Sequence, residues 1–282
     1  MNEEDREAID RKPSTTGAGN SPVVPKQLTL ESRLQFRCHP GIDCFTRCCS
    51  DIDIMLTPYD VIRMKQRLGI SSDRFLERYT RSRIEEKTGW PQLLIKMEES
   101  SGKPCPFVTT DGCTIYTDRP AMCRYYPIGQ GIHRKQVDDQ VVNEEFYMLI
   151  REEHCHGFSE ERQWTIAEWR ENQEAEHYDR MAGQWKELFV RNITREEEKD
   201  GRRQTMFFLA SYNLDQFRRF VLESRFLETF DIDAEETAAI REDDVRLMNL
   251  AFRYLRYLFG VEKTLSLREG VLPEEEPGGE GA

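Results

Sequence analysis

The sequence lacks long apolar segments. No window approaches the run of about 18 apolar residues that a membrane-spanning helix requires. Met1–Asn20 holds several acidic residues and no apolar run, unlike a secretory signal peptide. A chain of this kind is expected in the reducing cytoplasm, where structural disulfides are rare.

The signatures of nucleotide binding and of common hydrolases are also missing. There is no Walker loop, Gly-x-Ser-x-Gly elbow or His-Glu-x-x-His helix, and Gly129 and Gly131 lack the third glycine of a dinucleotide site. The net charge is −12, from 40 Lys and Arg against 52 Asp and Glu. This balance disfavours general nucleic-acid binding, which relies on a basic surface that neutralises phosphates.

Cysteine, by contrast, is concentrated in one part of the chain. The eight cysteines are Cys38, Cys44, Cys48, Cys49, Cys105, Cys113, Cys123 and Cys155. A role in filling the core would scatter them, so their confinement indicates one site, or two neighbouring sites, of sulfur chemistry. Clustered thiols fit a disulfide framework, inert buried thiols or metal ligation, and the expected compartment favours metal ligation.

The spacing leaves the metal and the ligand sets open. Cys48 and Cys49 join one tetrahedral site only if the chain turns sharply between them; otherwise they face different sites, or only one is a ligand. Eight thiolates suffice for two four-cysteine sites, each suited to zinc or an iron–sulfur cluster. The compact group and its remote partners favour the cluster, with zinc as the alternative. We expect at least one site to combine cysteines from the group before residue 50 with Cys105 or Cys113.

Histidines and arginines lie beside several cysteines. His39, His154 and His156 are candidates to replace a thiolate or to hydrogen-bond to a ligand sulfur. Four guanidinium groups either compensate thiolate charge or hold an anion, or else cap turns and pair with carboxylates. They belong to Arg37, Arg47, Arg119 and Arg124.

The cysteine segments together resemble a known family. They are Cys38–Cys49, Cys105-Pro106-Phe107, Gly112–Tyr116 and Arg119–Pro127. Their composite pattern is similar to the YkgJ family of cysteine-cluster proteins, a zinc- or iron-chelating domain of the CxxCxxCC type. The resemblance covers about residues 34–158, includes all eight cysteines and implies that they chelate metal. One branch of the family is linked to lysine methylation of flagellin, with a cluster and S-adenosylmethionine.

The sequence therefore predicts a metal-binding protein whose thiolates chelate an iron–sulfur cluster or zinc, in a mainly structural or redox role. Two alternatives stay open. The resemblance allows a cluster-dependent protein lysine methyltransferase of the flagellin type, although the Cys44-x-x-x-Cys48-Cys49 spacing departs from the C-x3-C-x2-C loop of radical S-adenosylmethionine enzymes. The other alternative is a metal-dependent interaction module that binds a protein partner through its helical C-terminal region.

The predicted fold class is α+β, a small cysteine-rich metal-binding region with short strands and helices, followed by a helical C-terminal region. The predicted divisions are a disordered segment 1–27, a cysteine-cluster domain 28–158, a helical region 159–262 packed on it, and a mostly disordered acidic tail 263–282.

Local signals predict the elements of both regions. Strands are expected at 29–37, 52–56 and 90–97, and a hairpin at 105–113 with its turn at 109–112. Val137–Ile150 fits two strands, or a strand and a helix. Helices are expected to begin at Thr57, Ser71 and Thr165, to include Phe207–Leu227 as one helix, and to span Asp243–Phe259.

Overall fold

The computed structural model describes residues 23–24, 26–86, 88–137, 140–190 and 201–270. The chain forms two compact units, each built from two separate stretches. The first unit comprises Met1–Ile54 and Met97–Asp179, and the second comprises Met55–Lys96 and Arg180–Ala282. All eight cysteines therefore belong to the first unit. The mixture of helices and short antiparallel strand pairs confirms the predicted α+β class.

Both units are discontinuous, whereas the predicted domains are continuous segments. Residues 55–96 lie in the predicted cysteine domain but pack with the helical C-terminal part. The tails 1–22 and 271–282, which are predicted to be disordered, lie outside the described residues. Within the predicted N-terminal disordered segment, however, the N–H of Val24 donates to the carbonyl of Leu149 at 2.9 Å. Independent folding of the predicted domains stays a prediction.

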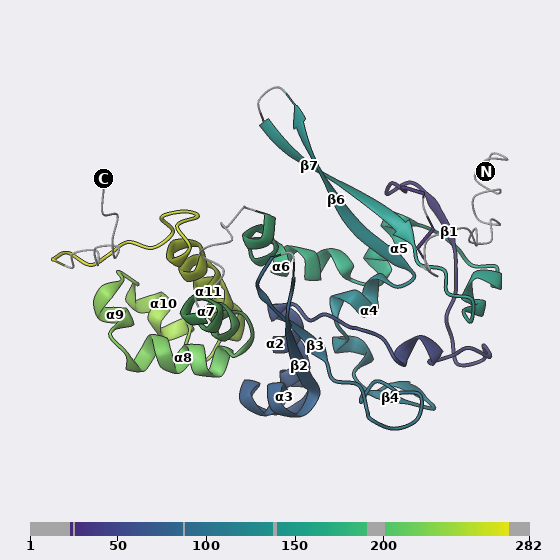
Figure 1. The fold of residues 1–282 in the computed structure, drawn as a ribbon, viewed down its shortest axis with the longest axis horizontal. Coiled ribbons are helices and arrows are strands. Elements are labelled where there is room, and N and C mark those ends of the chain that lie inside the picture. Colours follow the sequence, from purple (N-terminus) through teal and green to yellow (C-terminus); the bar gives the residue numbers. More distant parts are fainter. Residues whose placement is uncertain (1–22, 25, 87, 138–139, 191–200, 271–282) are drawn as a thin grey trace. The chain divides into compact units, whose positions relative to one another are not determined.

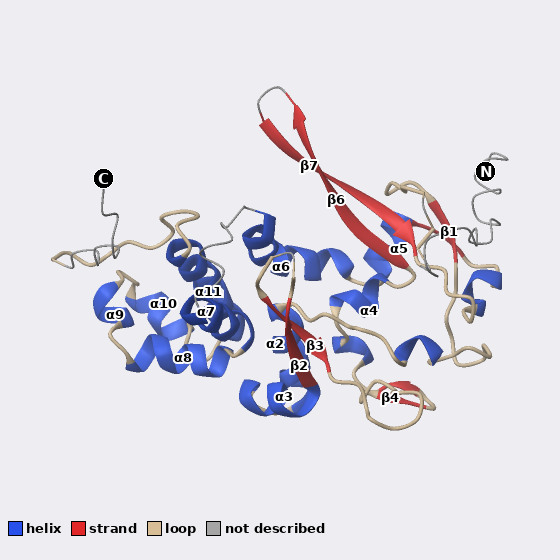
Figure 2. Cartoon of the chain, in the orientation of Figure 1, coloured by secondary structure: helices blue, strands red, loops and turns tan. Residues whose placement is uncertain are grey.

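The strands of the first unit form antiparallel pairs. They are β1 (Arg33–Gln35) with β8 (Gln163–Thr165), β4 (Val108–Thr109) with β5 (Gly112–Cys113), and β6 (Ile128–Val137) with β7 (Gln140–Leu149). Figures 1 and 2 show β6 and β7 as a long twisted ribbon. The segment 137–150 thus contributes a single strand, whose partner β6 was not predicted.

The helical turns of the first unit are short. They are η1 (Arg47–Cys49), η2 (Tyr116–Asp118), α4 (Ala121–Tyr125), η3 (His156–Ser159) and α5 (Ile166–Asn172). The next helix, α6 (Ala175–Val190), begins in the first unit and continues into the second.

The second unit combines a strand pair with helices. Its elements are α2 (Pro58–Leu68), α3 (Ser72–Tyr79), β2 (Thr80–Ile84), β3 (Pro91–Ile95), α7 (Gly201–Tyr212), α8 (Leu214–Glu223), α9 (Phe226–Thr229), α10 (Ala234–Ala239) and α11 (Asp244–Leu258). Trp90 packs at centroid distances of 4.8 Å on Phe207 and 4.9 Å on Phe259, which explains why residues 55–96 group with the C-terminal helices. No helix in the described part of the chain is both long and apolar enough to cross a membrane.

Capping residues place the helix ends where the sequence predicts them. The Thr57 hydroxyl accepts the N–H of Asp60, and the Asp60 carboxylate accepts the N–H of Thr57 at 2.7 Å, so the pair closes a capping box at the start of α2. Gly69 ends this helix with φ of +63°, a left-handed conformation that glycine adopts without a Cβ clash. The predicted helix starts at Ser71, Thr165 and Asp243 are confirmed as well.

Two predicted elements are wrong. Residues 52–56 form no strand, since within the described chain Met55 makes only an isolated bridge to Leu94. Phe207–Leu227 is not one helix but spans α7, α8 and α9. The break after α7 follows from Asn213, whose side chain accepts the N–H of Gln216 and so caps a new helix.

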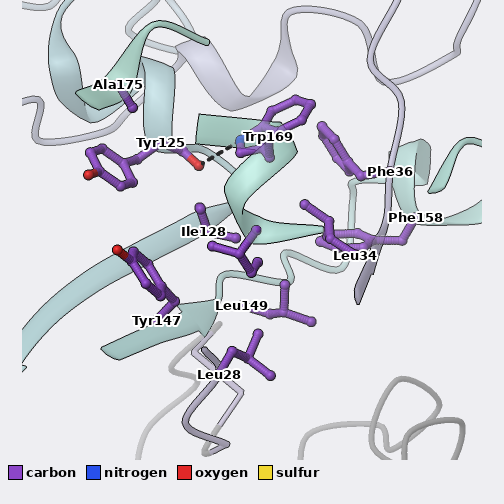
Figure 3. Packing of buried hydrophobic residues seen from close by; sticks show 11 residues of the cluster. Leu28, Leu34, Phe36, Tyr125, Ile128, Tyr147, Leu149, Phe158, Trp169 and Ala175 are labelled. Atoms are coloured by element: carbon purple, nitrogen blue, oxygen red, sulfur yellow. Dashed lines mark hydrogen bonds between the residues drawn. The ribbon is translucent and has the colours of Figure 1, made fainter. Parts of the chain in front are cut away.

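An aromatic core holds the first unit together (Figure 3). Phe36 is 1% exposed and meets the rings of Phe158 and Trp169 edge to face, at centroid distances of 5.2 and 5.5 Å. The indole N–H of Trp169 donates to the carbonyl of Tyr125 at 3.3 Å. Because Phe36 and Phe158 flank the first and last cysteines in sequence, the core anchors both ends of the cysteine region.

Candidate metal centre

Four thiols line one cavity of the first unit. Its walls are formed by Phe36, Cys38, Ile42, Cys44, Cys48, Tyr126, His154, Cys155 and Gly157. Cys44 is buried, Cys48 and Cys155 are half-buried, and Cys38 is exposed. The loop after β1 and the segment leading into η3 thus bring the first three cysteines of the chain together with the last.

Short backbone turns fold the loop after β1. The N–H of Ile42 donates to the carbonyl of His39 at 3.1 Å, and the N–H of Phe45 donates to the carbonyl of Ile42 at 2.9 Å. Thr46 has φ of +70°, a left-handed conformation that is uncommon for threonine. The chain therefore turns sharply just before η1, which carries Cys48 and Cys49.

Gly157 forms part of the cavity wall, where η3 and the segment after β1 approach each other closely. The N–H of Arg37 donates to the Gly157 carbonyl at 3.0 Å. A Cβ atom on Gly157 would lie 2.5 Å from a ring carbon of Phe36 and 3.1 Å from the Arg37 carbonyl. Because glycine has no Cβ atom, Gly157 permits this close contact between η3 and the two residues after β1, Phe36 and Arg37.

Backbone N–H groups from the start of η3 reach two of the sulfur atoms. The N–H of His156 donates to Cys44 Sγ at 3.1 Å. The N–H of Gly157 hydrogen-bonds to the Cys155 sulfur. Hydrogen bonds of this kind stabilise the thiolate, which is the form that ligates metal.

Partial burial opposes ionisation of the Cys38 and Cys155 thiols, although Cys38 as a whole residue is exposed. Burial, followed by the neighbouring thiols of Cys48, Cys155 and Cys44, raises the pKa of Cys38 to about 11. Burial also raises the pKa of Cys155, against hydrogen bonds from Tyr126 and from a backbone N–H. The four sulfur atoms thus lie within electrostatic range of one another, and a metal that binds them must displace their protons.

A short antiparallel pairing joins Cys49 to Cys105. The N–H of Cys105 donates to the Cys49 carbonyl at 2.7 Å, and the N–H of Asp51 donates to the Lys103 carbonyl at 2.9 Å. Asp51 has φ of +50°, so the chain turns again directly after this pairing. A cysteine from the group before residue 50 is thereby placed beside one from the later group.

The predicted hairpin brings Cys113 close to Cys105. β4 and β5 pair across the predicted turn, and Gly112 has φ of +117°, which favours glycine. Burial raises the pKa of Cys105 to about 11, and the nearby Cys113 thiol adds to that rise. The N–H of Phe107 hydrogen-bonds to the Cys105 sulfur and the N–H of Ile115 to the Cys113 sulfur, as Gly157 does for Cys155.

Arg119 connects Cys123 with this second group of thiols. Its guanidinium lies within electrostatic range of both Cys113 and Cys123. The same guanidinium lies over the ring of Tyr116, 3.9 Å from the centroid. Arg119 therefore fits the predicted role of a cation that compensates thiolate charge.

Arg124 fits the other predicted role, pairing within the fold. Its side chain is 2% exposed. It donates to the carbonyls of Arg119 at 3.1 Å, Gln173 at 2.8 Å and Thr117 at 2.6 Å. The guanidinium also lies 4.0 Å from the centroid of the Tyr178 ring. Arg124 thus ties the backbone of residues 117–119 to that of Gln173.

The adjacent Cys48 and Cys49 have different surroundings. Cys48 lines the cavity, whereas Cys49 pairs with Cys105. Their sulfur atoms remain close, since a hydrogen bond with Cys49, followed by burial, raises the pKa of Cys48. The backbone pairing with Cys105 thus leaves the Cys49 sulfur beside that of Cys48.

Of the three candidate histidines, one lies at the cavity. His154 forms part of its wall. His39 instead pairs with Glu160, 3.2 Å from Nε2 to the carboxylate oxygen, and the His156 side chain is exposed. Sequence reasoning missed Tyr126, whose hydroxyl donates to the Glu152 carboxylate at 3.0 Å and also contacts the Cys155 sulfur. Its position three residues after Cys123 is the signal that could have found it.

The donor set of the cavity suits a thiophilic metal. Thiolates and imidazole are the ligands of zinc, and thiolates hold iron–sulfur clusters. Among the described residues, no three His, Cys, Asp or Glu side chains stand close enough together to hold one ion. The thiols around the cavity must therefore draw together to bind a metal.

Comparison with known families agrees with this chemistry. The family model CxxCxxCC, described as "Putative zinc- or iron-chelating domain", matches residues 37–156. This segment begins one residue before Cys38 and ends one residue after Cys155. This match over residues 37–156 confirms the resemblance and supports a metal-binding role. No curated protein and no solved structure matches the chain significantly.

Proposed function

We propose that the protein binds metal through two groups of four cysteines. The first group is Cys38, Cys44, Cys48 and Cys155, and the second is Cys49, Cys105, Cys113 and Cys123. The observation that carries this proposal is the single cavity walled by the four thiols of the first group. The second group rests on the pairing of Cys49 with Cys105 and on the hairpin that carries Cys113.

The chain's own groups prepare each set of sulfurs for a metal. Burial limits access of water, and the N–H groups of His156 and Gly157 stabilise negative charge on the sulfurs of the first group. When bound, zinc would supply a structural cross-link, and an iron–sulfur cluster would also supply electron transfer. We favour the cluster because its ligands come from a compact loop and from remote partners, with zinc as the alternative.

Purification without oxygen tests the proposal. The full chain should carry metal, which elemental analysis, acid-labile sulfide and absorption spectra identify. Brown protein with iron and sulfide indicates a cluster, and colourless protein with zinc indicates the alternative. A chain that holds neither metal, as isolated or after reconstitution, contradicts the proposed function.

Chelation should also lower stability, because metal binding to folded ligands is linked to folding. Removing the metal should lower the melting temperature of the first unit, which contains all eight cysteines. Differential scanning calorimetry of the holoprotein before and after chelation measures this change. An unchanged melting temperature would show that the metal does not stabilise the fold.

A further inference from the structure

The imidazole of His154 is the one side-chain nitrogen among the residues that wall the sulfur-lined cavity. Its Nε2 atom is shielded from solvent and has no hydrogen-bond partner within the described residues. The carboxylate of Glu152 lies 3.5 Å away, beyond the usual range of a hydrogen bond. Glu152 is itself engaged by the hydroxyl of Tyr126. A shielded ring nitrogen beside four thiols is therefore available as a donor to a metal.

The four thiols of the cavity differ in their hydrogen bonds and in their exposure to solvent. Cys44 and Cys155 each receive a backbone N–H, and Cys48 bonds to its neighbour Cys49. No hydrogen-bond donor to the sulfur of Cys38 is found in the described part of the chain, and the residue is exposed. Cys38 is thus the thiol that leaves a shared metal most readily.

We propose that His154 Nε2 is a reserve ligand that takes the place of Cys38 at the metal of the first group. The proposal rests on the metal-binding function proposed above. Three cysteines and one histidine are an established donor set for zinc, and histidine replaces cysteine on one iron of Rieske clusters, so the exchange suits either metal. It replaces an anionic thiolate by a neutral imidazole, so the metal site becomes more positive by one charge. The protein then retains its metal when its exposed thiol is lost.

Substitution of each candidate ligand in the full chain tests this exchange. Cys38→Ser should retain the metal content of the unmodified chain, whereas Cys44→Ser should lose about half of it. Adding His154→Ala to Cys38→Ser should bring the content down to that of Cys44→Ser. Adding His156→Ala instead should not, because His156 is exposed and its backbone N–H to Cys44 survives the substitution.

Cobalt provides a readout that does not depend on how much metal is bound. Full-length Cys38→Ser reconstituted with Co²⁺ should show a strongly shifted, exchangeable proton signal from the ring N–H of a coordinated histidine. The signal should be absent from Cys38→Ser/His154→Ala and present in Cys38→Ser/His156→Ala. A Cys38→Ser protein with bound Co²⁺ but without this signal overturns the proposal.

The outcomes separate the inference from the proposed function. If the unmodified chain holds no metal, or if Cys44→Ser keeps all of it, the proposed function fails. If Cys44→Ser loses half while Cys38→Ser loses the same amount, the metal site stands and the reserve ligand is refuted. Equal metal contents for the two double variants refute the reserve ligand as well.

Discussion

At the scale of single residues, the two arginines that flank Cys123 have different tasks. Arg119 donates to the Tyr116 carbonyl and the Gln173 side chain and lies within electrostatic range of two thiols, whereas Arg124 has no thiol among its partners in the described chain and donates to three backbone carbonyls. The sequence places both beside the same cysteine and cannot separate these tasks, because the partners of Arg124 include Gln173, far along the chain. A buried guanidinium with several hydrogen bonds is a structural residue first.

Arg124→Ala should lower the free energy of unfolding by about 2–4 kcal/mol, because it leaves two buried carbonyls and one partly buried carbonyl without their donor. Denaturant titration measures the change. Arg241→Ala, at an exposed position, is the control and should stay within about 0.5 kcal/mol of the unmodified protein. If Arg124→Ala is as stable as this control, Arg124 does not hold the backbone together.

At the scale of elements, the contact between β1 and η3 sets the shape of the cavity. Gly157→Ala places a methyl group 2.5 Å from a ring carbon of Phe36 and should cost about 1–3 kcal/mol through overpacking. It should also reduce metal content, because relief of this clash displaces the Gly157 N–H that bonds to the Cys155 sulfur. Thermal unfolding and elemental analysis check both effects.

Gly183 offers a matched control for that substitution. It lies in α6, and a Cβ atom there would meet no atom within 4 Å. Gly183→Ala should raise stability by about 0.5–1 kcal/mol through helix propensity. Equal effects of the two substitutions would mean that the close approach at Gly157 carries no strain.

An ion-pair network joins the helices of the second unit. Lys65 on α2 pairs with Asp215 at 3.0 Å and with Asp244 at 3.1 Å, and Arg218 reaches both carboxylates. The N–H of Ser72 also donates to Asp215 at 2.6 Å. Burial alone would raise the pKa of Asp215, but the Ser72 N–H, Lys65 and Arg218 together lower it. The network therefore favours the ionised carboxylate.

Stability of the second unit should depend on this carboxylate in acid. Because the folded-state pKa of Asp215 lies below its unfolded value of about 3.8, its contribution is complete above that value and is lost as the pH falls through the folded pKa. Asp215→Asn should cost about 2 kcal/mol at pH 7, less than a fully buried pair, because the side chain is 24% exposed.

Thermal unfolding between pH 2 and pH 7 measures this dependence for Asp215→Asn beside Asp231→Asn, a substitution at an exposed position. Asp231→Asn should follow the unmodified protein, and Asp215→Asn should lose stability less steeply in acid. Parallel curves for all three proteins would contradict the assignment of the acid sensitivity to Asp215.

Local signals predicted the elements well where a side chain sets a boundary. Thr57 caps the helix that is predicted to begin there, and Gly112 takes the positive φ that its Asp-Gly turn requires. The prediction was wrong at Phe207–Leu227, because apolar spacing continues through Asn213 while the backbone starts a new helix there. Residues 52–56 have a strand-like pattern but pair with β3 only through the isolated bridge from Met55 to Leu94, so pattern alone misled the prediction.

At the scale of the whole molecule, the sequence identified the cysteine region but could not divide its thiols. Their spacing left open whether Cys48 and Cys49 share a site. The proposed division depends on the pairing of Cys49 with Cys105 and on the approach of Cys155 to the loop after β1. Both are contacts between segments far apart in sequence, which no local pattern encodes.

We propose that the eight cysteines act as two groups of four. The metal content of variants with two cysteines substituted tests this division. Cys44→Ser/Cys155→Ser removes two members of one group and should leave about half of the metal, as either single variant does. Cys44→Ser/Cys105→Ser removes one member of each group and should leave almost none. If both double variants hold the same amount of metal, the division into these two groups is wrong.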